Sequence, residues 1–259
     1  MLEARGLGYR LGERWLLRGV DLRVAPGEFW AILGPNGSGK TTLLRLLAGD
    51  LRPTEGEVAL LGVPLSAYSP EGLARRRAVL SQFRELTFPF TAYEVAFLGR
   101  LPHLQGRREG PEDHGKVREA LERARALPLQ GRVFLTLSGG EAMRVETARL
   151  LAQQPELFLL DEPTNHLDPR YTLELLALFR ALATSGKGVV AVLHDLNLAA
   201  LYADRLLLKE GRPLALGTPE EVLRPELLEE AYQVPFRVLG GPKGPRLVLA
   251  LPAEVVGDG

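Results

Sequence analysis

The chain has 259 residues, with 32 lysine plus arginine against 32 aspartate plus glutamate, so its formal net charge is zero and gives no indication of bulk nucleic-acid binding. Cysteine is absent, which excludes disulfides, thiolate metal sites and cysteine nucleophiles. Hydrophobic residues make up 46% and charged residues 25%, which is typical of a globular protein with a substantial core.

The amino terminus, MLEARGLGYRLGERW, has neither the apolar segment nor the cleavage site of a signal peptide. No apolar run reaches the roughly 18 residues of a membrane span. We therefore expect a cytosolic protein that serves a membrane only by docking onto a spanning partner.

The first strands are indicated by alternation. Residues 20–24 alternate apolar and polar side chains, and residues 57–61 fit another short strand. Because these strands do not alternate with helices, we expect a small antiparallel sheet beside a parallel core. Tyr9 is either an ordinary strand aromatic, which its position favours, or a platform on which a base stacks.

The stretch GPNGSGKTT fits Gly-x-x-x-x-Gly-Lys-[Ser/Thr] between an apolar run at 29–33 and leucines with helical spacing. Glycines let the backbone turn its N–H groups inward, and the helix that follows adds unpaired amides, so the loop suits a polyphosphate. Lys40 would contact the β and γ phosphates and Thr41 would complete a Mg²⁺ shell. The alternative is a glycine-rich turn with an incidental lysine. The candidate nucleotide-binding residues are Gly34, Pro35, Asn36, Gly37, Ser38, Gly39, Lys40, Thr41 and Thr42.

The middle of the chain indicates helices. A helix start at 69–71 precedes a strand at 78–82, a capping-box pair opens a helix at 91–98, and another helix begins at Pro111. We predict that residues 83–151 form a helical insertion into the α/β core.

A second glycine-rich helix start, LSGGE at residues 137–141, precedes a helical pattern that runs to Gln154. Such a start exposes backbone amides and is a second anion site, although Ser-Gly-Gly also makes an ordinary cap. The candidate residues are Ser138, Gly139, Gly140 and Glu141.

An apolar strand at 157–160 ends at Asp161 and Glu162, where open α/β sheets keep their chemistry. Asp161 can hold the Mg²⁺ shell and Glu162 can polarise an attacking water. The alternative is a pair of solvated acids.

Asp168-Pro169 caps a further amphipathic helix, and a strand at 189–193 ends at His194, which either donates to a γ-phosphate or is an ordinary structural histidine. The residues expected on the inner face of that helix are Leu173, Leu176, Phe179 and Leu182. Beyond them we expect a hairpin over 206–216, a helix that begins at Thr218, and a terminal hairpin over 236–251 without visible chemistry.

In this order the motifs resemble the ATP-binding subunit of ABC transporters, and the resemblance covers nearly all of the chain. It implies an α/β fold: a P-loop NTPase (RecA-like) core with an N-terminal antiparallel β subdomain and an inserted α-helical subdomain. The implied bounds are 1–82 and 152–232 for the β subdomain and core, 83–151 for the helical subdomain with the signature motif, and 233–259 for a C-terminal hairpin tail.

The resemblance also implies the cofactors ATP and Mg²⁺ and a role for each matching residue. The implied roles are adenine stacking for Tyr9, phosphate binding for Gly34 to Thr42, contact with Mg²⁺ and the attacking water for Gln82, ATP contact across a dimer for the signature residues Leu137 to Glu141, the metal shell for Asp161, general base for Glu162, contact with the partner subunit for Asp168, and the switch histidine for His194. The implied metal ligands are Thr41, Gln82 and Asp161.

Two copies of such a chain are expected to pack head to tail, so that the signature helix of one covers the ATP held by the phosphate loop of the other. The helical subdomain would bind a transmembrane permease dimer, with a substrate-binding protein engaged indirectly and no nucleic acid. The resemblance thus implies a peripheral subunit at the cytoplasmic face of the cell membrane.

The finer resemblance is to importers of iron chelates and corrinoids, and most closely to haem-import ATPases. This resemblance rests on the amino-acid sequence at residues 71–82, 87–91, 98–103 and 190–200. It implies ATP hydrolysis that powers haem (hemin) uptake, with a ferric siderophore or vitamin B12 as the alternative cargo.

Two positions depart from the family's usual pattern. Met143 stands where relatives usually carry glutamine, and Asn165-His166 is more typical of the soluble translation-factor branch. A soluble ABC protein that acts on ribosomes or DNA is therefore the more distant alternative. A nucleotide-binding scaffold without turnover is a third hypothesis, and it conflicts with the presence of Glu162.

Overall fold

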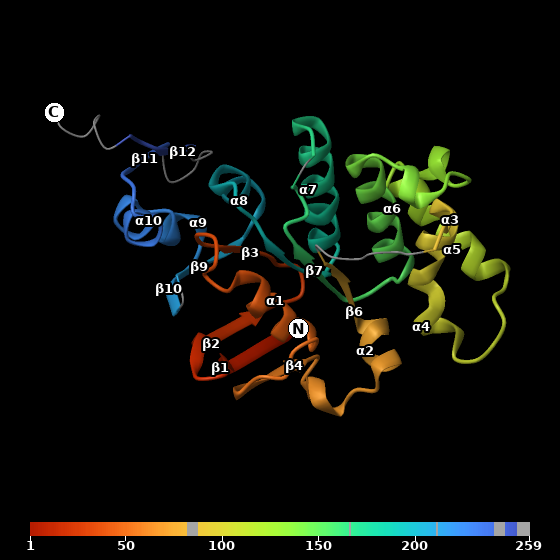
Figure 1. Cartoon of the computed structure of the whole chain (residues 1–259), viewed down its shortest axis with the longest axis horizontal. Coiled ribbons are helices and arrows are strands. Elements are labelled where there is room, and N and C mark those ends of the chain that lie inside the picture. The colour runs from red at the N-terminus through yellow and green to blue at the C-terminus, as the bar shows by residue number, and fades with distance from the viewer. Residues whose placement is uncertain (82–87, 166, 211, 241–246, 253–259) are drawn as a thin grey trace. The chain divides into compact units, whose positions relative to one another are not determined.

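The computed structural model describes residues 1–81, 88–165, 167–210, 212–240 and 247–252 (Figure 1). The chain divides into two compact units, and we describe each by itself. Unit 1 comprises Met1–Ser66 and Leu176–Gly259, and unit 2 comprises Ala67–Leu175. Gln82 lies outside the described residues.

Unit 1 contains an antiparallel sheet with strand order β2-β1-β4-β5 (Figure 1). Its strands are β1 Leu2–Leu11, β2 Arg14–Val24, β4 Glu55–Leu60 and β5 Val63–Pro64. Leu2 pairs with Val24 on one side and with Leu60 on the other, and all three side chains are buried. Side chains alternate across a pleated strand, so one apolar face packs inward while the polar face remains in water. The predicted antiparallel sheet is confirmed.

Unit 1 also contains short strands that pair mainly in parallel. The elements are β3 Phe29–Leu33, β8 Gly188–Val192, β9 Arg205–Glu210 and β10 Arg212–Gly217, with helices α1 Lys40–Ala48, α8 Leu196–Tyr202, α9 Pro219–Val222 and α10 Pro225–Tyr232. Strand β3 pairs in parallel with β8 and β9, and β10 pairs antiparallel with β9. Every residue of β3 and β8 is buried, which explains why these strands read as continuous apolar runs instead of alternating ones.

The terminal hairpin also forms as predicted. Its strands are β11 Phe236–Leu239 and β12 Leu247–Ala250, paired antiparallel with Val238 opposite Val248. Val248 is 5% exposed and faces the rest of unit 1, where α8 contacts β12.

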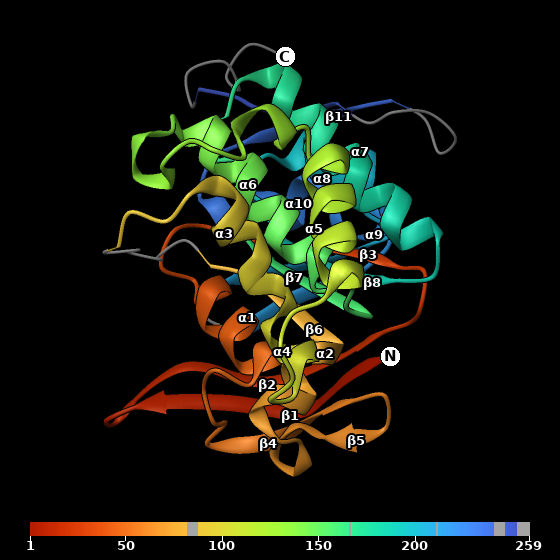
Figure 2. The same ribbon diagram turned by 90° about the vertical axis from the view of Figure 1, so that its right-hand side faces the viewer.

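Unit 2 is mainly helical, apart from two parallel strands, β6 and β7, that pair with each other. Its elements are α2 Pro70–Arg76, β6 Arg77–Leu80, α3 Ala92–Phe97, α4 Leu101–Leu104, α5 Pro111–Arg123, α6 Gly139–Ala152 and β7 Leu157–Asp161; α7, Pro169–Thr184, begins here. Short 3₁₀ helices lie at Leu65–Ala67, Leu98–Arg100, Leu127–Leu129 and Phe134–Thr136. Helices α3, α5 and α6 pack side by side through buried residues such as Val95, Val117 and Val145 (Figure 2).

A buried ionic cluster fixes one end of α6. Arg100 and Asp113 are 2% and 0% exposed, and the Arg100 Nε lies 3.2 Å from the Asp113 carboxylate. Arg107 donates to the same carboxylate at 2.7 Å, and this bond does most to hold the pKa of Asp113 well below its usual range. Arg100 also donates to the carbonyl of Ala152, the last residue of α6, at 2.8 Å. The cluster therefore joins α5 to the carboxyl end of α6.

One predicted inner-face residue is wrong. Leu173 on α7 is 44% exposed, whereas Leu175, two positions later, is 2% exposed. The buried stripe runs through Tyr171, Leu175, Leu176 and Phe179, and Leu173 lies outside it because a helix turns by about 100° per residue. No helix within the described ranges is both long and apolar enough to cross a membrane.

Candidate functional site

The phosphate loop joins β3 to α1, as predicted. Gly34, Gly37 and Gly39 have φ values of 144°, 77° and 89°. A residue with a Cβ rarely adopts this region, so the path of the loop depends on glycine at these positions. The buried strand before the loop and the buried leucines of α1 hold both of its ends.

The sequence supplies no side-chain cap at the amino terminus of α1. Gly39 is the N-cap and makes no side-chain capping bond, and the first turn, Lys40 to Leu43, contains no acid. The first amides of a helix have no partner within the helix and carry the positive end of its dipole. The start of α1 can therefore accept an anion from outside the helix.

Lys40 lies across this loop. It is 5% exposed, and its Nζ donates to the carbonyl oxygens of Gly34 at 2.8 Å and Pro35 at 2.9 Å. These bonds hold the ammonium group at the loop, where it adds a full charge to the partial charges of the amides. Thr41 and Thr42 follow, half-buried, in the first turn of α1.

His194 follows β8, the strand next to β3. Ile32 pairs with Val192, and the amide of Leu193 donates to the carbonyl of Ile32 at 3.2 Å. The chain therefore leaves β8 at the same edge at which β3 leads into Gly34. The structure brings the exposed His194 and the phosphate loop to the carboxyl ends of neighbouring parallel strands.

Two sets of hydrogen bonds hold the first turn of the helix that follows His194. Asp195 caps α8 by accepting bonds from the amides of Asn197 and Leu198 at 2.8 and 3.1 Å. The side chain of Asn197 exchanges two hydrogen bonds with the backbone of Val248 in the terminal hairpin, at 2.7 and 3.2 Å. The hairpin thus holds the segment that carries His194.

Tyr9 has an ordinary strand position. It lies in β1 opposite Leu17, half-buried, next to a register irregularity. Adenine stacking by Tyr9 stays a prediction.

The acidic pair lies in unit 2. Asp161 is the last residue of β7 and is 5% exposed, and Glu162 follows with a φ of 50°. The amide group of Asn165 donates to the Glu162 carboxylate at 2.5 Å. Asp168 accepts a bond from the amide of Tyr171 at 2.9 Å and so caps α7, as predicted.

The signature helix caps itself. The Ser138 hydroxyl accepts from the amide of Glu141 at 3.3 Å, and the Glu141 carboxylate accepts from the amide of Ser138 at 2.9 Å. Arg132 lies 2.5 Å from the same carboxylate. The bonds from Ser138 and Arg132 lower the pKa of Glu141, with the Ser138 backbone bond the largest cause. Gly139 and Gly140 form the first turn of α6.

The side chains of Arg132 and Asn165 also contact predicted site residues, and sequence reasoning gave them no such role. Asn165 stands three positions after Glu162 in a turn that contains Pro163. This spacing could have been used to predict the contact. Arg132 approaches Glu141 only because the chain between them folds back, so no local pattern indicated it.

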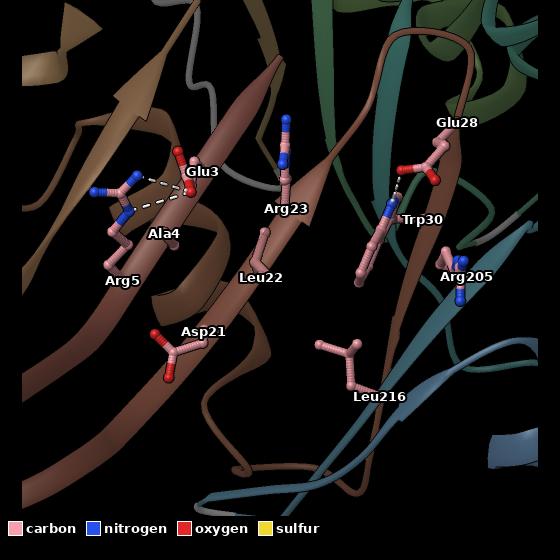
Figure 3. Close-up of a pocket in the computed structure, with 10 residues that line it drawn as sticks. All are labelled: Glu3, Ala4, Arg5, Asp21, Leu22, Arg23, Glu28, Trp30, Arg205 and Leu216. Atoms are coloured by element: carbon pink, nitrogen blue, oxygen red, sulfur yellow. Dashed lines mark hydrogen bonds and ion pairs between the residues drawn. The ribbon is translucent and has the colours of Figure 1, made fainter. Parts of the chain in front are cut away.

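A cavity of about 440 Å³ in unit 1 contains none of the predicted site residues (Figure 3). It is lined by Glu3, Ala4, Arg5, Asp21, Leu22, Arg23, Glu28, Trp30, Arg205 and Leu216. Its three acids have partners within the fold: Glu3 binds Arg5, Glu28 accepts from the indole of Trp30, and Asp21 accepts from a backbone amide. These carboxylates serve the fold, and we assign the cavity no part in nucleotide chemistry.

Comparison with known proteins agrees with this geometry. The family model described as "ABC transporter" matches residues 17–165. The hemin import ATP-binding protein of Gloeobacter violaceus is 47% identical over 260 residues, covering 97% of this chain and 94% of the relative. The proteins of the same name from Streptomyces coelicolor and Pseudomonas aeruginosa are 49% and 46% identical, over 93% and 96% of this chain and 86% and 100% of theirs.

Solved structures also resemble the chain in shape. A metal-chelate type ABC transporter in an inward-facing conformation has a TM-score of 0.83 at 26% identity and covers 98% of both chains. A dimeric ATP-binding cassette in a post-hydrolysis state, bound to ADP and Pi, has a TM-score of 0.74 at 30% identity, over 85% of this chain and 99% of its own. The expected P-loop NTPase fold with an antiparallel β subdomain and a helical part is confirmed, and the chain belongs to the ABC transporter family.

Proposed function

We propose that this chain is the ATP-hydrolysing subunit of an importer and powers the uptake of hemin through a membrane permease. The observation that carries the proposal is the agreement among curated relatives. Proteins 42–49% identical over at least 93% of this chain bear the name of hemin import ATP-binding proteins. A ferric siderophore or a corrinoid is the alternative cargo, which the resemblance to a metal-chelate type transporter favours.

The phosphate loop supports the binding half of this proposal. The open start of α1 would bind the phosphates through its amides, and Lys40 would exchange its bonds to the Gly34 and Pro35 carbonyls for phosphate oxygens. The loop residues Gly34 to Thr42, with Tyr9 beneath the base, are the proposed nucleotide contacts.

Mg²⁺ fits the chemistry of the proposed ligands. The Thr41 hydroxyl, the Asp161 carboxylate and the Gln82 amide all offer oxygen, the donor that Mg²⁺ prefers. The described residues contain no cluster of three or more His, Cys, Asp or Glu side chains able to hold a metal ion by themselves. A Mg²⁺ ion held mostly by phosphate oxygens and water requires no such cluster, and when bound it would neutralise charge on the β and γ phosphates.

Glu162 is the proposed general base, and His194 would donate to the γ-phosphate from the strand next to the loop. Phosphoryl transfer requires positioning and charge stabilisation more than covalent help, and a carboxylate that orients water supplies the former. Ser138, Gly139, Gly140 and Glu141 of a second copy would cover the nucleotide, and Asp168 would reach across the same interface. The dimeric state of similar cassettes supports a dimer of this chain, and the head-to-tail packing is part of the proposal.

The cargo is tested by recovering the tagged chain from its own cells' membranes with its partners and measuring ATP hydrolysis. Hemin, a ferric siderophore and a corrinoid are each added with their binding protein. We expect stimulation by hemin alone. Stimulation by another cargo alone would retain the motor and replace hemin, and recovery with ribosomes or DNA without a permease would contradict the importer.

Glu162→Gln tests the hydrolytic step separately. The amide keeps the size of the side chain but cannot accept a proton, so this variant should bind ATP and accumulate as an ATP-bound dimer. Removal of a general base lowers kcat by roughly 10²–10⁴-fold. Size-exclusion chromatography with ATP would report the dimer, and hydrolysis at the parent rate would contradict the assignment of the base.

A further inference from the structure

Asn165 contacts Glu162 twice. The Asn165 backbone amide donates to the Glu162 carbonyl at 3.2 Å, and the Asn165 side-chain amide donates to Oε2 of the Glu162 carboxylate at 2.5 Å. The two residues are separated by Pro163 and Thr164, so the contacts close a single tight turn at the end of β7.

The turn depends on an unusual backbone conformation at Glu162. Its φ of 50° lies in the left-handed region, which costs an L-residue roughly 1–2 kcal/mol. Such a conformation persists only where its surroundings enforce it, and it is often found at functional sites. Pro163 fixes its own φ and restricts the residue before it, Glu162, and the bonds from Asn165 fix the far side of the turn.

The side-chain bond also orients the carboxylate. A carboxylate whose two oxygens are equivalent can rotate, whereas a donor on Oε2 fixes the plane of the group. A base that must orient one water gains from such fixation, because a misplacement of about 1 Å can cost roughly 10²-fold in rate.

We propose that Asn165 is a positioning residue for ATP hydrolysis, which holds the Glu162 carboxylate in the orientation that meets the attacking water. This inference rests on the proposed role of Glu162 as the base. It also gives a physical reason for the asparagine at position 165, where the chain departs from the family's usual pattern.

Substitutions at Asn165 separate positioning from structure. Asn165→Asp keeps the shape of the side chain, cannot donate to Oε2 and places a second negative charge beside it. Asn165→Ala only removes the donor, and Asn165→Ser keeps a shorter one. We expect kcat to fall roughly 10²-fold for Asp and about 10-fold for Ala, with partial rescue in Ser and an unchanged KM for ATP. Gln130→Glu, an equivalent amide-to-acid change at an exposed position in unit 2, should hydrolyse ATP at the parent rate.

A double-mutant cycle with Glu162→Gln completes the test. If Asn165 acts through Glu162, adding Asn165→Ala to Glu162→Gln should lower the residual rate no further. A full, independent loss in the double variant would overturn the inference, as would a kcat for Asn165→Asp within twofold of the parent. If Glu162→Gln alone keeps the parent rate, the proposed base is wrong, and this outcome is distinct from a failure at Asn165.

Discussion

The amino termini of α1 and α6 have the same signal in the sequence, a glycine-rich start that exposes amides, but they differ in the structure. Helix α1 makes no side-chain cap, has no acid in its first turn and holds a cation, Lys40, against its loop. Helix α6 has a complete capping box of Ser138 and Glu141 and a further ion pair to Arg132. A glycine-rich helix start is therefore an open anion site only where the chain does not supply its own anion.

The two anion sites inferred from the sequence should therefore differ in how they bind a phosphate. The amides of α1 can bind phosphate directly, whereas a phosphate at α6 has to share Ser138 with its cap and meet the carboxylate of Glu141. A single copy of the chain should thus bind ATP through α1, and α6 should contribute only when a second copy brings it to a nucleotide that is already bound.

The largest expected effect concerns the anchor of α6. Asp113→Asn removes the carboxylate that pairs with the buried Arg100, and an uncompensated buried charge costs about 3–5 kcal/mol. We expect the free energy of unfolding, measured with urea, to fall by about this amount at pH 7. Because the pKa of Asp113 is lowered in the folded chain, its contribution is present above about pH 3.9, the ordinary value, and is lost as the pH falls below it. The two proteins should converge in acid, and a constant difference down to pH 2 would contradict the ionic origin of the effect.

The next effect tests α1. Lys40→Ala removes the full charge at the phosphate loop, and loss of one such stabilising group typically costs roughly 10²–10³-fold in kcat. ATP binding by the isolated chain should weaken as well, which isothermal titration would measure. The control is Lys116→Ala, which removes a lysine from a surface pair with Glu112 and should leave both quantities unchanged. ATP binding by Lys40→Ala at the parent affinity would show that α1 does not need the cation.

A smaller effect is expected at the cap of α6. Ser138→Ala should lower stability by about 1 kcal/mol, because it leaves the amide of Glu141 without its cap bond. The matched control is Ser69→Ala, which removes the same kind of cap from α2 in the same unit. Both variants should lower Tm by roughly 2–4 °C, but only Ser138→Ala should lower the ATPase rate of the dimer. Equal ATPase rates would assign Ser138 to helix capping alone.

The smallest effect tests the charge of Glu141. Glutamine preserves the capping box, so Glu141→Gln should leave the helix intact while it removes the ion pair with Arg132. ATP-driven dimerisation should tighten by no more than about fivefold, the range of an exposed charge pair, and the gain should shrink at high salt.

The stability difference between the parent chain and Glu141→Gln should depend on pH. Because the pKa of Glu141 is lowered in the folded chain, the advantage of the carboxylate in stability is present above about pH 4.3 and disappears as the pH falls. Glu94→Gln in the capping box of α3 is the control, since Glu94 also has a lowered pKa but caps a helix without a proposed ligand. A change in dimerisation with Glu94→Gln would show that the effect is not specific to α6.

The sequence alone determined the elements around the phosphate loop. Gly34, Lys40 and Thr41 required a strand, a loop and a helix, and the buried strand, the loop and the helix are all present. The capping box at Thr91 formed where it was predicted, because a cap depends on residues only three positions apart. Local spacing was sufficient wherever the chemistry was local.

Tertiary structure decided what each helix end can do. The Ser-Gly-Gly start at residues 138–140 was compatible with an anion site and with an ordinary cap, and only the fold brought Arg132 to the Glu141 carboxylate. The buried partners of Asp113 and the tie between Asn197 and Val248 also join residues distant in sequence. Leu173 was misplaced because the leucines of α7 allow more than one buried stripe. Side-chain contacts across long separations depend on packing, and packing is set by the whole fold rather than by any short pattern.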